Sequence, residues 1–135
     1  MLAIFADTIG PMFLNLSELS SDSFTDQIIK QIRAKVVSGR LAPGSSLPSV
    51  RVLARETKIS VMTVKNAYSA LVNAGLIRSH QGKGYFVSAL DSEEKRNLAL
   101  QQCRTNLKPI IQTAIAENLS AKDIIQIVKE LSKSQ

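Results

Sequence analysis

The sequence predicts a mainly α-helical protein with one small β-hairpin, arranged as a winged helix-turn-helix domain followed by a C-terminal helical dimerisation unit. Two short helical segments are separated by only three or four residues near 57–60, and a hairpin pattern follows directly at 76–88. Beyond residue 91, apolar residues recur at three- and four-residue intervals. We therefore expect a partly irregular lead-in (1–22), a winged helix-turn-helix domain (23–90) and a helical dimerisation domain (91–135).

The first predicted helix is introduced by a serine-rich polar linker at 16–22. Ser23 and Asp26 form the acidic version of a capping box, and Gly39 supplies the helix end. Its spacing predicts one inward stripe: Ile28, Ile29, Ile32 and Val36. After a turn at 40–44, Leu41 and Leu47 are expected to cover the edge of the core.

Two further helices form the predicted helix-turn-helix. The first is expected to start at Pro48, because proline is tolerated in a first helical turn, and to end near Thr57. The second is capped by Ser60 and runs over 61–74 until Gly75 provides a left-handed residue. Helices joined by so short a turn pack at a steep angle, the geometry that presents the second helix to a DNA major groove.

The faces of the second helix follow from its spacing. The predicted core stripe is Val64, Ala67, Tyr68, Leu71 and Gly75. The opposite face carries no carboxylate and consists of Met62, Lys65, Asn66, Ser69 and Asn73. These side chains suit base edges and phosphates, although the face alone is more typical of an ordinary solvated helix.

The segment after Gly75 favours the nucleic-acid interpretation. Two strand-like runs, 76–80 and 85–88, flank Gln81-Gly82-Lys83-Gly84, whose glycines allow a tight hairpin and a close backbone approach to phosphate. Positive charge is concentrated here as well. Residues 24–90 contain ten Lys and Arg but two acids, within a chain of net charge +6.

Four motifs stand in register along this region: Leu47-Pro48-Ser49, Ala67-Tyr68, Gly75-Leu76-Ile77 and Gly82-Lys83-Gly84. Through them, about residues 24–88 resemble the DNA-binding domain of GntR-family transcription regulators. The Ala67-Tyr68 pair and the short remainder are similar to the YtrA-type branch, which has a small helical dimerisation unit. The resemblance implies a homodimer on a pseudo-palindromic operator, with transporter genes among its targets.

The resemblance also implies DNA contacts at Ser49, Arg51, Thr63, Lys65 and Gly82. The sequence departs from the family at the start of the recognition helix, where Val61 and Met62 replace the arginine or other polar residues of many members. Asn66 also stands where many have arginine. The complete predicted set is Ser49, Arg51, Ser60, Met62, Thr63, Lys65, Asn66, Ser69, Gln81, Gly82 and Lys83.

Residues 91–135 predict two amphipathic helices. Asp91 and Glu94 are expected to cap the first, and Pro109 to kink it or break it near 106–108, while Ser120 and Asp123 cap the second. The apolar positions predicted to form a homodimer interface are Leu100, Cys103, Leu107, Ile110, Ile111, Ala114, Ile124, Ile127, Val128 and Leu131. About 45 residues are too few to enclose a small-molecule pocket, so no effector is expected.

Catalytic chemistry is not predicted. His80 is the sole histidine and Cys103 the sole cysteine, so neither a metal site nor a disulfide framework is expected, and no cofactor is implied. A lone cysteine favours a cytoplasmic location. The apolar N-terminus lacks a basic leader and is interrupted by Gly10 and Pro11, so neither a signal nor an anchor is expected. The remaining alternatives to duplex DNA binding are a winged-helix adaptor for an acidic protein and a structured-RNA binder.

Overall fold

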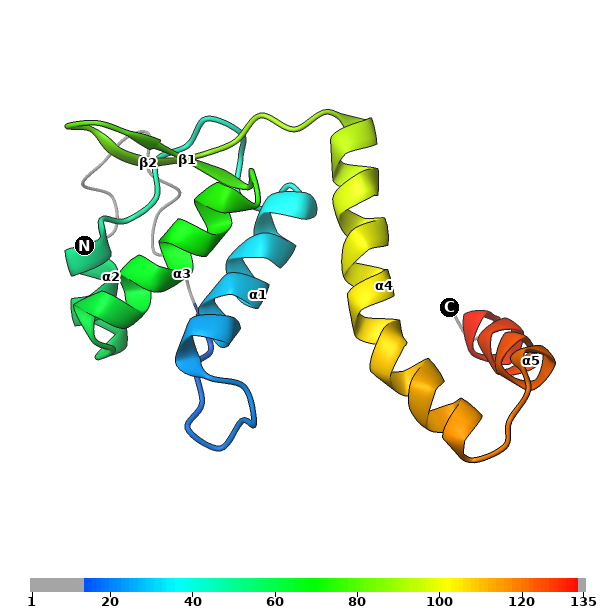
Figure 1. Ribbon diagram of the computed structural model, residues 1–135. Coiled ribbons are helices and arrows are strands. Elements are labelled where there is room, and N and C mark those ends of the chain that lie inside the picture. Colours follow the sequence, from blue (N-terminus) through cyan, green and yellow to red (C-terminus); the bar gives the residue numbers. More distant parts are fainter. Residues whose placement is uncertain (1–13, 134–135) are drawn as a thin grey trace. The chain divides into compact units, whose positions relative to one another are not determined.

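The computed structural model describes residues 14–133, so the predictions for residues 1–11 lie outside the described part of the chain. The chain divides into two compact units, with the boundary between Ser92 and Glu93. The elements of the N-terminal unit are α1 (Phe24–Val37), α2 (Val50–Thr57), α3 (Val61–Asn73), β1 (Ile77–His80) and β2 (Gly84–Val87) (Figure 1). The C-terminal unit consists of α4 (Ser92–Ala116) and α5 (Ala121–Ser132). The predicted fold class, mainly helical with a small β-hairpin, is confirmed.

The core of the N-terminal unit lies between α1, α2 and α3, with the hairpin at its edge. Helices α1 and α3 lie side by side, and α2 packs against α3 (Figure 1). The fully buried large side chains are Tyr68, Ile28, Ile32, Leu53, Leu71, Leu76, Ile77, Val64 and Val87. Leu41 and Leu47 are also buried, as predicted. On α1 the predicted stripe is wrong at Ile29, which is half-buried, while Gln27 is buried beside Ile28.

Helix ends account for two further corrections. Helix α2 begins at Val50 rather than Pro48, because Ser49 is its N-cap and accepts a hydrogen bond from the Val52 amide at 3.1 Å. Helix α3 begins after Ser60, as predicted, but Gly75 is exposed instead of facing the core. Gly75 lies beyond the helix with a φ of 79°, and its role is to end α3.

The hairpin is antiparallel and is tied to the segment before α2. Its register pairs Ile77 with Val87 and His80 with Gly84. The Leu47 amide donates to the Tyr85 carbonyl at 2.8 Å, and the Val87 amide donates to the Ser45 carbonyl at 2.9 Å. Residues 44–47 therefore extend along β2, an attachment that the sequence analysis did not predict.

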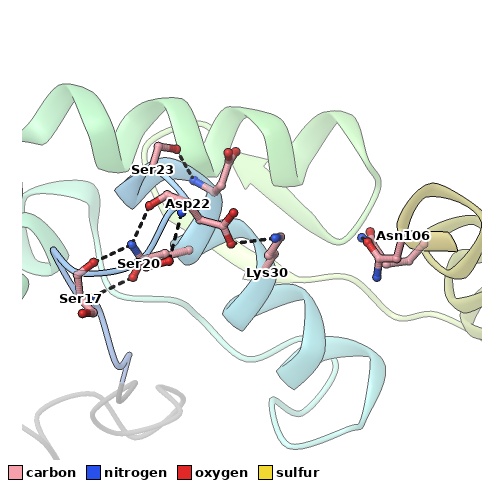
Figure 2. A network of polar contacts seen from close by, with 9 residues as sticks. Ser17, Ser20, Asp22, Ser23, Lys30 and Asn106 are labelled. Carbon is pink, nitrogen blue, oxygen red and sulfur yellow. Dashed lines mark hydrogen bonds and ion pairs between the residues drawn. The ribbon is translucent and has the colours of Figure 1, made fainter. Parts of the chain in front are cut away.

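The serine-rich lead-in is fastened to α1 by side chains of that helix. The Gln27 side chain accepts a hydrogen bond from the Ser17 backbone N–H at 2.8 Å and donates one to the Ser17 carbonyl at 2.9 Å. Gln31 forms the same pair of bonds with the backbone of Asn15. Figure 2 shows the Lys30 ammonium beside the Asp22 carboxylate, 2.8 Å apart, and Ser23 at the start of α1. Residues 15–22 are thus held against α1 by hydrogen bonds and one ion pair.

Pro109 lies inside a continuous helix in the C-terminal unit. Of the two outcomes predicted for it, a kink or a break near 106–108, the break is wrong. One missing N–H removes one hydrogen bond, which a 25-residue helix tolerates. Helix α5 begins with the predicted capping box, in which Ser120 and Asp123 exchange hydrogen bonds of 2.8 and 3.1 Å. None of the helices within residues 14–133 combines the length and hydropathy of a membrane span.

Candidate nucleic-acid interface

Helix α3 presents a continuous polar face opposite its buried stripe. Val64, Ala67, Tyr68 and Leu71 are fully buried, and this orientation turns the opposite side outward. Met62, Lys65, Asn66, Ser69 and Asn73 are all exposed, and the Met62 side chain is 62% exposed. The face therefore offers one cation, two amides, a hydroxyl and a thioether to a partner, with no acid to repel phosphate.

The first turn of α3 holds two predicted contact residues together. The Ser60 hydroxyl accepts a hydrogen bond from the Thr63 amide at 3.1 Å and lies 2.7 Å from the Thr63 hydroxyl. Ser60 is exposed and Thr63 is half-buried. One hydroxyl hydrogen of the pair is used internally, so the pair retains a single hydroxyl proton for an outside acceptor such as phosphate.

The start of α2 carries the other two predicted phosphate contacts. Ser49 caps the helix and Arg51 lies in its first turn, and both are exposed. The first-turn amides of a helix and its dipole favour an anion, and the Arg51 guanidinium adds a full positive charge at the same end. This end of α2 has no acidic residue in its first turn.

The hairpin turn exposes three predicted residues: Gln81, Gly82 and Lys83. The Lys83 amide donates to the His80 carbonyl at 2.9 Å, which closes the turn. Gly82 has a φ of 77°, a conformation that side-chain-bearing residues rarely adopt. Because no atom lies within 4 Å of the position that a Cβ would take, the need for glycine comes from the backbone alone. The Lys83 side chain is thus carried at the tip of a short, closed turn.

A buried tyrosine connects these three parts. The Tyr68 hydroxyl donates to the Pro48 carbonyl at 2.8 Å, one residue before the α2 cap. Its ring meets the ring of Tyr85 on β2 edge to face, with centroids 4.8 Å apart. Burial raises the pKa of the Tyr68 hydroxyl well above its ordinary value.

Two exposed residues near this surface were not among the predicted contacts. Val61, the first residue of α3, is 49% exposed and lies one turn before Lys65. Arg78 is an exposed cation on β1. Helical spacing would have indicated Val61, since it shares a face with Lys65, and strand alternation would have indicated Arg78, since it follows the buried Ile77.

The predicted dimer residues lie on two helices that bury nothing of their own. Neither α4 nor α5 contains a buried residue. Ile111, Ala114 and Ile124 are half-buried, and the other seven predicted positions are exposed; Ile110 reaches 62% and Leu131 reaches 67%. The structure also adds exposed apolar residues that the sequence analysis omitted: Ile115, Leu119 and Ile125.

Metal chemistry has no visible basis in this surface. Within residues 14–133, no three His, Cys, Asp or Glu side chains gather in a group that could hold a metal ion. Cys103 is an exposed free thiol on α4.

Comparisons with known proteins place the chain among DNA-binding regulators. The family description "Bacterial regulatory proteins, gntR family" matches residues 24–87. The transcriptional repressor YtrA of Bacillus subtilis is 28% identical over 88% of this chain and 92% of its own length. The repressor NagR of the same organism is 38% identical over 60% of this chain, which spans only 33% of NagR. The solved structure of YtrA from Sulfolobus acidocaldarius, a GntR-family transcription factor, is 30% identical, with a TM-score of 0.54 over 89% of this chain and 97% of that one.

Proposed function

The chain belongs to the GntR family of DNA-binding transcription regulators, and we propose that it acts as a homodimeric repressor on a pseudo-palindromic operator. The observation that carries the proposal is the acid-free exposed face of α3, backed by a fully buried stripe. Because the GntR family consists of DNA-binding regulators, we propose no enzymatic role. That relatives similar to the chain are named repressors supports repression.

The proposed contacts divide between bases and backbone. In the major groove, Met62 meets a thymine methyl, Asn66 pairs with adenine, and Lys65 reaches guanine or phosphate. Ser69 and the Ser60–Thr63 pair lie along the same helix as secondary contacts to the groove wall. This division assigns sequence preference to α3.

The remaining contacts fix the position of the domain on the duplex. Ser49 and Arg51 hold a phosphate at the start of α2. The turn at 81–84 lies against the neighbouring minor groove, with Gln81 and Lys83 directed at the backbone. Phosphate contacts position a protein on DNA without reading its sequence, so these residues supply affinity rather than preference.

Structured RNA and an acidic protein partner are the competing ligands. A-form RNA has a deep, narrow major groove that a helix does not enter, so the exposed face of α3 does not suit it. We expect selection from random DNA duplexes to yield an inverted repeat whose half-sites are about one helical turn, ~34 Å, apart. An RNA duplex of the same sequence serves as the control. Failure to enrich any motif, or equal binding to the RNA, would contradict the proposal.

Dimerisation through the C-terminal unit is supported by its lack of buried residues. Two helices that bury none of their apolar side chains gain little stability from packing within the chain, and a second copy covers the same faces by symmetry. The proposed domain division follows: a lead-in to residue 22, the reading domain to residue 90 and the dimerisation domain beyond it.

Sedimentation of the full chain tests this assignment. Ile110→Asp introduces a charge into the predicted interface and should shift the dimer to monomer at micromolar concentration. Thr105→Asp introduces the same charge on the opposite side of α4 and should leave the dimer intact. A monomeric wild-type chain, or an Ile110→Asp variant that remains dimeric, would refute the assigned interface.

Repression itself is tested by a reporter gene whose promoter overlaps the selected DNA site. Expression should fall when the protein is produced and recover when the site is scrambled. Increased expression would identify an activator. We also propose transporter genes as natural targets, from the family resemblance, and a cytoplasmic location, from the lone cysteine.

A further inference from the structure

We propose that Tyr68 is a positioning residue for DNA recognition, which sets the phosphate-binding start of α2 against the recognition helix through its hydroxyl bond to Pro48. The inference rests on the proposed function. It adds a role for a side chain that is fully buried and therefore cannot itself touch DNA.

The geometry connects the hydroxyl directly to the phosphate site. Tyr68 lies in the middle of α3, within its buried stripe, and its hydroxyl donates to the Pro48 carbonyl at 2.8 Å. The next residue is Ser49, whose hydroxyl caps α2 by accepting from the Val52 amide at 3.1 Å. A single side chain therefore links the helix that reads bases to the residue just before the cap of the phosphate-binding helix.

The segment before α2 is held on its other side by the wing. The Leu47 amide donates to the Tyr85 carbonyl at 2.8 Å, and the Tyr85 ring packs edge to face on Tyr68. Residues 47 and 48 are thus held by β2 and by α3, at consecutive positions. Removal of the Tyr68 hydroxyl would leave the ring packing and the Leu47 bond in place, but would free the chain at the residue adjoining the cap.

A displacement of the α2 start should weaken phosphate binding measurably. Hydrogen bonds to phosphate need donor–acceptor distances of about 2.7–3.0 Å, so a small displacement is enough to lose one. The bases are contacted from α3, whose own position is fixed by four fully buried side chains. Loss of the hydroxyl should therefore weaken phosphate contact and leave base preference unchanged.

The experiment compares Tyr68→Phe with the wild-type full chain on the DNA site selected by the wild type. We expect the affinity of each subunit for its half-site to fall roughly tenfold, as for the loss of about one charge-assisted hydrogen bond. The log–log slope of affinity against salt should become shallower by about one for each subunit of the dimer, and the selected motif should not change. These two readouts distinguish positioning from a general loss of stability.

Thr57→Val is the matched control. Thr57 is the last residue of α2, at the end away from Ser49. The substitution removes a partly buried hydroxyl that donates to the Leu53 carbonyl at 2.7 Å. Binding is measured at a temperature where circular dichroism shows both variants folded. The control should bind DNA as the wild type does, even if its melting temperature falls as far as that of Tyr68→Phe.

A thermodynamic cycle with Arg51→Ala adds an independent readout. If Tyr68 acts through the start of α2, the combined variant should lose less affinity than the product of the two single losses. Wild-type affinity and slope in Tyr68→Phe would overturn the proposal, as would an equal loss in Thr57→Val. A Tyr68→Phe chain that does not fold would also overturn it, because the hydroxyl would then serve the fold itself. A wild-type chain that fails to bind duplex DNA would instead refute the proposed function.

Discussion

Asn66 provides the sharpest test of which residue reads bases. Its side chain is exposed on α3, and an amide opposite adenine can form two hydrogen bonds in the major groove. Replacement by alanine removes both bonds, so we expect a loss of about 1–3 kcal/mol of discrimination, roughly 5- to 150-fold, at one or two base pairs. The fold should be unaffected, because alanine is the better helix former at an exposed position.

Asn73 is the matched control for this substitution. It carries the same side chain on the same face of α3, seven residues later, and is exposed as well. At a rise of about 1.5 Å per residue it lies about 10 Å further along the helix, away from the N-terminal end that reads bases in helix-turn-helix proteins. Asn73→Ala should therefore keep the wild-type preference.

The assay is binding-site selection for the three proteins, followed by competition between the selected duplex and single base-pair variants. Asn66→Ala should lose preference at a defined position in each half-site, while Asn73→Ala should return the wild-type motif. An unchanged motif in Asn66→Ala, or a change in Asn73→Ala, would show that the base contacts are assigned to the wrong part of α3.

Three further predictions address other parts of the chain. Lys83→Ala should weaken binding to all duplexes alike, and a changed motif by selection would contradict its assignment to the DNA backbone. Replacing thymine by uracil opposite Met62 removes only a methyl group and should lower wild-type affinity; anisotropy titrations with Met62→Ala should show no such effect, and equal losses in both proteins would refute the contact. In α5, hydrogen bonds from Ser120 lower the pKa of Asp123, so this carboxylate stabilises the helix above its ordinary pKa of about 3.9 and that contribution is lost as pH falls through the lower, folded value. Circular dichroism should show helix loss at acid pH that is diminished in Asp123→Asn, and an unchanged acid profile would oppose the capping role.

The parts of the fold that the sequence predicted are those governed by local chemistry. Ser23, Ser60 and Ser120 each cap a helix as expected, because a cap involves residues only three apart. The exposed face of α3 followed from helical spacing and the hairpin from its glycines. The sequence places the start of α2 too early, at Pro48, because proline suits the first helical turn. Ser49 suits the cap position still better, and the helix begins after it.

The missed features depend on residues far apart in the sequence. The bond from Leu47 to Tyr85 and the bond from Tyr68 to Pro48 join segments that only the packed fold brings together. Gln27 and Gln31 hold the backbone of residues 15–17, a use of glutamine that has no periodic signature.

The salt dependence of duplex binding tests the central claim most directly. Ten Lys and Arg against two acids in residues 24–90 form the charge basis of that claim. If Arg51, Lys65, Lys83 and their counterparts in a second copy neutralise on the order of six phosphates, the log–log slope of affinity against salt should be about −5. Anisotropy titrations of the full chain on its selected duplex between about 50 and 200 mM salt cover the range in which such a slope is resolved. A slope near −5 is the result that duplex recognition predicts, and a slope near zero would contradict it.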